Sequence, residues 1–395
     1  MTAAIFAARA GAKVTLLEHT DRIGKKILST GNGKCNLSNR KLNESSYRSN
    51  CADFPMAVLS RFGVAQTVSF FEELGIVIKE RDGYLYPYSG QASSVVEVLC
   101  SELSKRRVGV VTGCIVEKIL DHEGELREYT VVTSRGRFHG DSVILAAGSM
   151  AAPSTGSDGS GYKLAKTLGL TVVKPLPALV QLRCKDKFYK QISGIRTDAS
   201  VTITSGGEIL ASDRGELQVT DYGISGIPVF QVSRFAAKAL DAGKKVEALI
   251  DFYPECGNTD VERMLDKRYS IECEQCMDDF FTGWFNKKLG QLFLNLAGID
   301  KKRAVKTLNA QEKALLILLI KEFRTEVSAT NPFENAQVAC GGVDVSQINS
   351  HTMEVKQRKG LYLIGELLDV DGICGGYNLQ WAWSTGAIAG THAGV

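Results

Sequence analysis

Two hydrophobic periods alternate along the first part of the chain. Residues 3–10 are small and apolar, which favours a buried helix ending at Gly11, and residues 14–17 form a short apolar strand that stops at Glu18. Helix-like and strand-like patterns then follow one another at residues 64–74, 75–79, 94–103, 109–119 and 143–147. This alternation predicts an α/β fold with a doubly wound, mainly parallel sheet and helices on both faces.

The pattern changes after Pro175 and Pro177. Alternating segments at 201–204 and 216–220, separated by glycine turns, predict antiparallel strands in a small β-barrel-like domain. Residues 260–323 are helical in pattern and rich in charge, as expected of a separate helical insertion. Further on, a buried-strand pattern at 361–365 and a helix at 379–389 return the chain to the α/β layer. The expected segments are 1–177, 178–255, 256–325, 326–355 (a return through the β-domain) and 356–395.

Composition and charge argue against several classes of protein. A chain of 395 residues is long enough for two or three domains. The 47 Lys and Arg against 44 Asp and Glu give a net charge of +3, without the basic excess expected of a nucleic-acid-binding domain, so no nucleic acid partner is predicted. The longest apolar run, 314–320, is far shorter than the roughly 18 residues of a membrane span. With no leader pattern at the start, the ten cysteines are expected to be reduced thiols in the cytoplasm.

One cysteine pair is close enough to suggest a metal site. Cys273 and Cys276 have the spacing of half a zinc site, but no second pair of ligands follows at a suitable distance. We therefore predict no metal and interpret the pair as part of a helix.

The first helix and strand resemble half of a dinucleotide-binding motif. In such folds a glycine-rich turn precedes the helix, and an acidic residue about 20 residues further on binds a ribose hydroxyl. Glu18 occupies the acidic position. The first strand and its glycines would precede Met1, so we expect the natural reading frame to begin upstream. The alternative is an ordinary buried βαβ fragment in which Glu18 is merely solvated.

Residues 30–36 read Thr-Gly-Asn-Gly-Lys-Cys-Asn, which is a loop. Glycines allow backbone to approach a flat ring, and asparagine amides can donate and accept along the polar edge of a flavin. The preceding lysines could lie against a pyrophosphate. The alternative is an exposed turn with surface lysines. Candidate cofactor-binding residues here are Lys25, Lys26, Gly31, Asn32, Gly33, Cys35 and Asn36.

The most specific signal lies in residues 360–383, where a strand, a glycine-rich loop and a helix start follow directly. A helix that begins after two glycines presents unpaired N–H groups, which suit the negative charge on the N1/O2 edge of a reduced flavin. A tight strand-to-helix connection is the alternative. The candidate residues are Gly365, Glu366, Asp369, Gly375, Gly376, Asn378 and Leu379.

These motifs resemble the bacterial FAD-dependent proteins grouped as the YhiN/BaiN or aminoacetone-oxidase-like flavoproteins. Further motifs of the resemblance, which is nearly end to end, lie at 84–93, 146–149, 155–162, 215–226 and 340–343. The resemblance implies a two-dinucleotide-binding-type FAD domain interrupted by a β-barrel-like and a helical domain. It also implies that Glu18 binds the adenosine ribose, that Val116 contacts adenine through its backbone and that Gly148 passes near FAD. Cys374 departs from the hydroxyl residue of many relatives.

The function implied is that of an FAD oxidoreductase. NAD(P)H would reduce the flavin, which would pass hydride to a small, apolar organic acceptor held between the FAD domain and the β-domain. One activity suggested by the resemblance is reduction of the C4 and C6 double bonds of 3-oxo bile acids. Tyr84, Tyr86 and Tyr222 are candidates to line the cleft or donate a proton. The alternatives are an amine oxidase and a flavin-binding sensor or partner protein without turnover.

Overall fold

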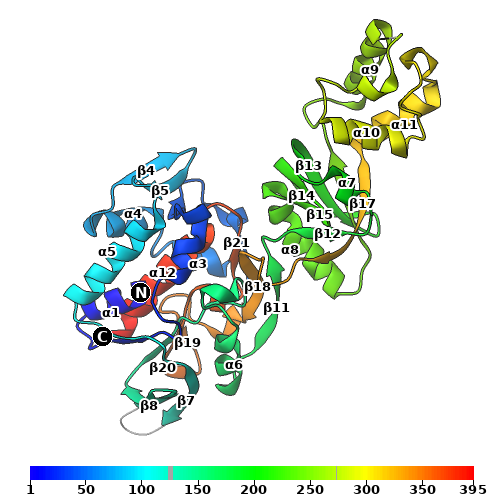
Figure 1. Ribbon diagram of the computed structural model, residues 1–395. Helices are drawn as coiled ribbons and strands as arrows, with labels where there is room; N and C mark the ends of the chain where they lie inside the picture. Colours follow the sequence, from blue (N-terminus) through cyan, green and yellow to red (C-terminus); the bar gives the residue numbers. More distant parts are fainter. Residues whose placement is uncertain (123–127, 273) are drawn as a thin grey trace. The chain divides into compact units, whose positions relative to one another are not determined.

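The computed structural model describes residues 1–122, 128–272 and 274–395. The chain divides into two compact units, of which the first combines Met1–Leu176 with Gln337–Val395 and the second is Pro177–Ala336 (Figure 1). The first unit is thus built from both ends of the sequence. Because each unit has its own buried core, each is described by itself.

Parallel strand pairs form the centre of the first unit. Strand β1 (Thr15–Leu17) pairs with β6 (Gly109–Val111), and β10 (Val143–Leu145) pairs with β20 (Arg358–Leu363). Strand β19 (Glu354–Val355) extends the second pair beyond β20. Two further sheets have three strands each: β2 (Ser38–Asn39), β5 (Tyr84–Pro87) and β4 (Ile78–Arg81) form one, and β7 (Val116–His122), β8 (Glu128–Thr133) and β9 (Gly136–Gly140) form the other. Two sheets have two strands each: β3 (Tyr47–Arg48) with β21 (Asp371–Gly372), and β11 (Val172–Ala178) with β18 (Val338–Val343).

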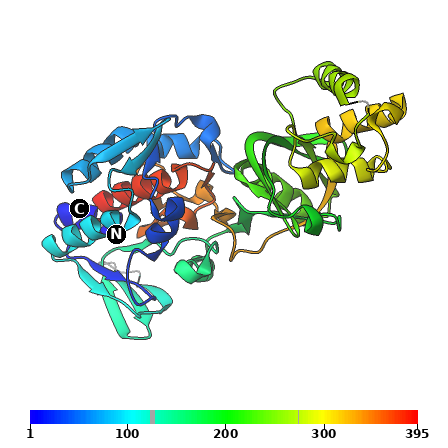
Figure 2. The same ribbon diagram turned by 45° about the horizontal axis from the view of Figure 1, so that its top comes forward.

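Helix α12 (Tyr377–Ala393) crosses the first unit against α1 (Thr2–Arg9) (Figure 2). Glycine makes this contact possible, since a Cβ atom built on Gly390 would lie only 2.3 Å from the Ala3 carbonyl oxygen. The other helices of the unit are α2 (Lys25–Ser29), α3 (Phe54–Leu59), α4 (Val64–Glu73), α5 (Ala92–Lys105) and α6 (Ser160–Thr167). The chain ends are therefore packed together as one helix pair.

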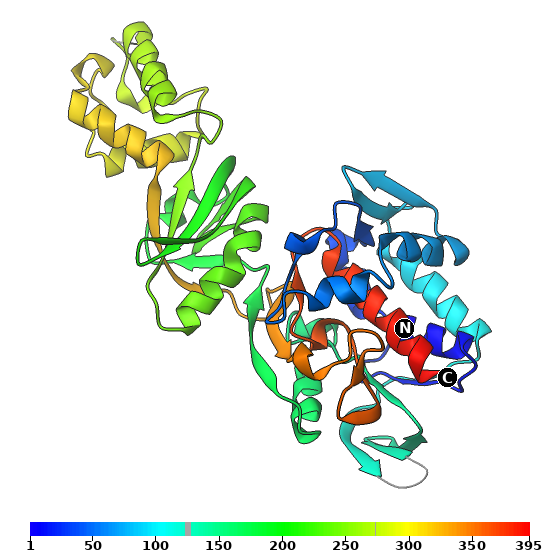
Figure 3. The ribbon, with the colours of Figure 1, turned by 180° about the vertical axis from the view of Figure 1, so that it is seen from behind.

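A closed six-stranded antiparallel barrel forms the second unit, in the order β12, β15, β14, β13, β16 and β17. Its strands are β12 (Leu182–Cys184), β13 (Arg196–Ser205), β14 (Glu208–Thr220), β15 (Gly223–Gly226), β16 (Val246–Asp251) and β17 (Phe323–Thr330). Its helices are α7 (Tyr189–Ile192), α8 (Ile227–Asp241), α9 (Asn258–Glu272), α10 (Lys287–Leu296) and α11 (Ala310–Lys321). Figure 3 shows α9 to α11 grouped at one end of the barrel.

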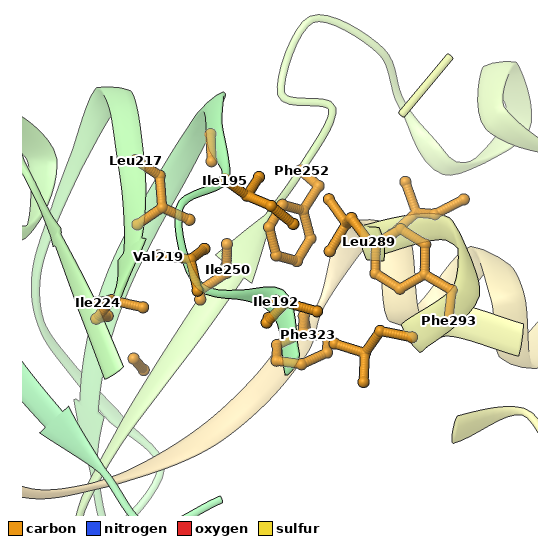
Figure 4. Packing of buried hydrophobic residues seen from close by; sticks show 14 of the residues in the cluster. Ile192, Ile195, Leu217, Val219, Ile224, Ile250, Phe252, Leu289, Phe293 and Phe323 are labelled. Atoms are coloured by element: carbon orange, nitrogen blue, oxygen red, sulfur yellow. The ribbon is translucent and has the colours of Figure 1, made fainter. Parts of the chain in front are cut away.

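The barrel and these helices share one hydrophobic core. Val219 and Ile224 lie inside the barrel, Phe252 and Phe323 lie at its end, and Phe293 of α10 packs against both phenylalanines (Figure 4). All five side chains are almost completely buried. The helical insertion expected from the sequence is therefore continuous with the barrel core.

The predicted fold class, an α/β domain interrupted by a β-barrel and a helical insertion, is confirmed. Some boundaries differ from those expected. The run expected at 109–119 divides into β6 and β7, because Gly113 between them takes a left-handed φ of 58°. Residues from Gln337 onward belong to the first unit, so the expected return segment 326–355 is divided between the two units. Within the described parts of the chain, we find no helix with the length and apolarity to cross a membrane.

Candidate functional site

The two glycine-rich loops predicted from the sequence meet at the start of α12. Gly376, the residue before the helix, has a φ of 93°, and among the described residues no side chain caps the first helical N–H groups. A Cβ built on Gly376 would lie 2.7 Å from Asn36 Oδ1 and 2.9 Å from the Ser38 carbonyl oxygen. Only glycine fits here, so the contact between the loops requires the residue that the sequence supplies.

The first loop is held in an unusual backbone conformation. The left-handed region is occupied by three residues of the short turn Thr30–Gly33 and by one residue after it: Gly31 (φ 56°), Asn32 (φ 52°), Gly33 (φ 80°) and Cys35 (φ 56°). Cys35 is fully buried, and burial raises the pKa of its thiol to about 12. The thiol is therefore protonated at neutral pH and is no candidate nucleophile.

Asn36 is the best indication that this loop faces a ligand. Its side chain is 7% exposed, and its Oδ1 atom accepts no hydrogen bond from the residues that the structure describes. A buried amide oxygen without a donor costs free energy, so a bound group with an N–H would compensate it. The polar edge of a flavin carries such a donor at N3, and the open N–H groups of α12 suit its N1/O2 edge. The residues present therefore fit FAD.

A buried polar network fixes the first loop to α12. Ser38 Oγ donates to Gln380 Oε1 at 2.6 Å, and Gln380 Nε2 donates to Thr67 Oγ1 at 2.8 Å and to Ser384 Oγ at 2.9 Å. Ser38, Gln380 and Ser384 have no exposed surface. Sequence analysis missed this network, because Gln380 has the spacing of an ordinary polar position on a helix.

Asn378, which the sequence predicts to bind the cofactor, forms hydrogen bonds within its own loop. Its Oδ1 accepts from Gly372 N at 2.7 Å, and its Nδ2 donates to Gly372 O at 2.9 Å and to Ile373 O at 3.3 Å. The side chain thus fixes the turn that leads into α12. Leu379 next to it packs against the core formed with α4 and α5.

Glu18 follows β1, as expected of a ribose-binding acid. Its Oε1 accepts from Thr20 N at 2.7 Å and lies 3.7 Å from His19 Nδ1. Gly156, in the loop after β10, approaches the same carboxylate, since a Cβ built there would lie 3.9 Å from Glu18 Oε1. The structure thus brings Glu18 together with the loop that follows β10.

Two further predicted residues lie in this part of the unit. Gly148, just after β10, has a φ of 72°, and a Cβ built on it would lie 2.9 Å from Ser157 Oγ. Val116 is half-buried and opens β7 opposite Thr133.

The two predicted pyrophosphate lysines have partners within the chain. Lys25 pairs with Asp21. Lys26 Nζ donates to Ala151 O at 3.0 Å and to Gln337 O at 3.2 Å, and it lies 3.8 Å from Glu366 Oε2. Lys26 therefore joins α2 to the loop after β10 and to the C-terminal strand region.

The acids of the C-terminal motif are also anchored. Glu366 Oε2 accepts from Ser149 Oγ at 3.3 Å. Asp369 is buried, and its Oδ2 accepts from Asn50 N at 3.3 Å. The backbone of Gly365 accepts from Trp381 Nε1 and donates to Thr385 Oγ1, both at 3.0 Å. The Gly365 bonds hold the start of this segment against α12, and the other two bonds tie it to Ser149 and Asn50.

The three candidate tyrosines do not lie in one unit. Tyr84 and Tyr86 belong to β5 of the first unit, next to both glycine loops. Tyr222 belongs to the barrel, where its hydroxyl accepts from Asn331 Nδ2 at 2.9 Å and its ring lies 4.8 Å from the Arg183 guanidinium carbon.

The residues described contain no group of side chains able to hold a metal ion. Of the cysteine pair considered above, Cys273 lies outside the described residues. Cys276 directs its thiol to the Lys301 carbonyl oxygen at 2.6 Å.

Comparison with known proteins identifies relatives over the whole chain. A family model described as HI0933-like protein Rossmann domain matches residues 1–392. A 3-dehydro-bile acid delta(4,6)-reductase of Clostridium scindens is 45% identical over 400 residues, covering 100% of this chain and 96% of the relative. A ribosomal RNA dihydrouridine synthase of Haemophilus influenzae is 31% identical over 383 residues, covering 96% of this chain and 92% of the relative. A solved 3-ketosteroid-delta4-(5alpha)-dehydrogenase from Rhodococcus jostii is 14% identical with a TM-score of 0.47, covering 100% of this chain and 94% of that chain.

Proposed function

Because this chain belongs to the HI0933-like family of Rossmann-domain proteins and is an oxidoreductase, we propose that it is an FAD-dependent reductase of conjugated carbon–carbon double bonds. The family resemblance read from the sequence motifs is confirmed, and so is the prediction of an enzyme. The proposed electron donor is NAD(P)H. The proposed acceptor is an apolar enone, best a 3-oxo bile acid with double bonds at C4 or at C4 and C6.

The observation that carries this proposal is the meeting of the two glycine loops at the start of α12. The loops lie far apart in the sequence, yet Gly376 is in contact with Asn36, whose buried Oδ1 lacks a donor. Bound FAD would supply hydride transfer at its N5 atom. The chain would position the flavin and supply the electrostatic field around it. Gly31 to Asn36 and Gly375 would line the ring, and the N-terminus of α12 would favour negative charge near it.

The remaining predicted residues would hold the adenosine end. Glu18 would accept from ribose hydroxyls, and the Val116 backbone would contact adenine. Gly148 would allow backbone to pass close to the cofactor. Lys26 and Glu366 would act together, because their contact joins the N-terminal and C-terminal parts of the site. Lys25 and Asn378 would shape this surface through the internal bonds they already make.

The names of the relatives support the acceptor class. A 3-dehydro-bile acid delta(4,6)-reductase and a dihydrouridine synthase both saturate a carbon–carbon double bond that is conjugated with a carbonyl group. The same chemistry would apply here, with hydride added at the β-carbon and a proton at the α-carbon. The 45% identity to the bile acid enzyme favours a steroid over a uracil ring. Uridine in ribosomal RNA is the second candidate, since the 31% relative covers nearly the whole chain.

Anaerobic half-reactions test the proposal. The full-length protein with FAD is reduced with NADH or NADPH while the flavin absorbance is followed, and candidate acceptors are then added. We expect a 3-oxo-Δ4 bile acid to reoxidise the flavin and to yield the saturated ketone. Reoxidation by uridine-containing ribosomal RNA alone would favour the second candidate. If amines reduce the flavin and no enone reoxidises it, the reductase proposal is wrong.

A further inference from the structure

Strand β5 presents two phenols on one face. Its residues alternate, with Leu85 only 1% exposed and with Tyr84 and Tyr86 on the opposite face. The pairing of β5 with β2 places Asn39 directly opposite Tyr84. The β2 segment continues the first glycine loop, so this face of β5 belongs to the candidate site.

Both tyrosines contact the glycine loops. A Cβ built on Gly375 would lie 2.8 Å from Tyr84 Cε1, and one built on Gly31 would lie 3.9 Å from Tyr86 Cε1. Tyr86 is also close enough to Cys374 for the two groups to interact electrostatically. The Tyr86 ring therefore lies beside the first loop and near the second.

Among the described residues, the hydroxyl of Tyr86 has no hydrogen-bond partner, in contrast to three buried tyrosines of this unit. Tyr47 donates to Tyr377 O at 2.8 Å, Tyr129 donates to Lys359 O at 2.8 Å, and Tyr162 donates to Glu366 O at 3.5 Å. Across the described residues, no hydrogen bond engages the Tyr86 hydroxyl, and the side chain is only half-buried. Its O–H is free to donate to a bound molecule.

The electrostatic surroundings keep this phenol neutral. Burial raises the pKa of Tyr86, and Tyr84 and Cys374 raise it further, while Arg81 lowers it. Lys79 lies opposite Tyr86 on β4 and shares its face of the sheet. A phenol that stays protonated through the neutral range can act as a proton donor.

We propose that Tyr86 is the catalytic acid that protonates the α-carbon of the enone. This inference rests on the proposed function, which supplies the reductant as two-electron-reduced FAD. Hydride forms a C–H bond at the β-carbon, and the π electrons of the double bond move toward the carbonyl as an enolate. The enolate α-carbon then takes the proton from Tyr86 Oη, so that the O–H bond breaks and a C–H bond forms. The phenolate left behind is reprotonated by water.

The test compares Tyr86→Phe with Tyr88→Phe in the full-length holoprotein. Tyr88 lies two residues further along, is 69% exposed and is not part of the site. With chemically reduced flavin and a 3-oxo-Δ4 bile acid, we expect Tyr86→Phe to slow reoxidation by about 10²- to 10⁴-fold, the usual contribution of a positioned acid. Tyr88→Phe should match the parent. Both variants should bind FAD as tightly as the parent, because phenylalanine keeps the ring contact with Gly31.

A second measurement uses the parent protein and so does not depend on the variant folding. The reoxidation rate should hold through the ordinary tyrosine pKa of 10.0 and fall only as pH rises further toward the raised pKa of Tyr86, because the phenol then loses the proton it must donate. The deuterium of D₂O should appear at the α-carbon of the product.

The outcomes separate the two proposals. Reoxidation of Tyr86→Phe within two-fold of a fast parent, or a parent rate that already falls at a pH below 10.0, would overturn the role of Tyr86 and leave the reductase function standing. A parent whose reduced flavin does not react with the enone would overturn both.

Discussion

The start of α12 and the aromatic cluster of the second unit are both buried, but they are stabilised in different ways. The aromatic cluster, which we define as Phe252, Phe281, Phe285, Phe293 and Phe323, is made of rings at centroid distances of 5.5 to 6.4 Å. The α12 start is held instead by directional bonds among Ser38, Thr67, Gln380 and Ser384 and by glycine contacts. The first arrangement supplies stability, and the second fixes the placement of the two glycine loops relative to α12.

The cluster should dominate stability. The Phe293 side chain has no exposed surface and packs against the other four rings of the cluster. Phe293→Ala removes all of these contacts. Truncation of a buried phenylalanine costs about 3 to 5 kcal/mol, since it loses transfer free energy and leaves a cavity. Urea unfolding followed by fluorescence should show this loss in the transition of the second unit.

Leu296→Ala is the matched control, on the same helix but with Leu296 42% exposed. We expect its unfolding free energy to stay within about 0.5 kcal/mol of the parent. Equal losses for the two variants would mean that burial in the cluster does not set the stability of this unit.

The polar network should have the next largest effect. Gln380→Leu keeps the side-chain volume but leaves the Ser38 and Thr67 hydroxyls without their partner in a buried site. Unsatisfied buried groups cost about 1 to 3 kcal/mol each, so we expect a loss of about 2 to 3 kcal/mol in the unfolding free energy. A double-mutant cycle with Ser38→Ala should give a coupling of at least about 0.5 kcal/mol. Strict additivity would show that the two residues do not act as one network.

The contrast also explains what sequence reasoning could recover. Hydrophobic period and glycine spacing, which are local signals, predict barrel strands at 201–204 and 216–220, helical structure within 260–323, a helix at 379–389 and the location of both glycine loops. The role of Gln380 is not local, since its partners Ser38 and Thr67 are more than 300 residues away. The bond that Asn378 makes within its own loop is local, but the sequence could not predict it, because an asparagine after glycines suits a turn and a ligand equally well.

The glycine contact should affect the cofactor more than the fold. Gly376→Ala places a Cβ 2.7 Å from Asn36 Oδ1 in a residue with a φ of 93°. Left-handed strain alone costs about 1 to 2 kcal/mol, and the loops must also move apart. We expect FAD affinity to fall about 10- to 100-fold in fluorescence titrations.

Gly75→Ala controls for backbone strain, because Gly75 has a φ of 94° in the same unit and no atom within 4 Å of a built Cβ. It should lower stability while leaving FAD affinity close to that of the parent. If both variants lose FAD equally, strain rather than the loop contact is responsible, and Gly376 leaves the proposed site.

The smallest effect concerns one thiol in each unit, the fully buried Cys35 and the half-buried Cys184, and appears only at high pH. Burial raises the pKa of Cys35 to about 12, and it raises the pKa of Cys184 in the barrel to about 11, from an ordinary 9.0. A raised pKa in the folded state means that the unfolded thiol releases its proton first. The contribution of each thiol is therefore complete below pH 9.0 and is lost as pH rises toward its folded pKa. The slope is up to about 1.4 kcal/mol per pH unit for each thiol.

Cys35→Ala should thus flatten the decline in unfolding free energy between pH 9.0 and about 12, and Cys184→Ala should flatten it only between pH 9.0 and about 11. Urea unfolding at successive pH values, compared with the parent, measures both. Parallel pH profiles for parent and variants would show that neither thiol is kept neutral by its burial.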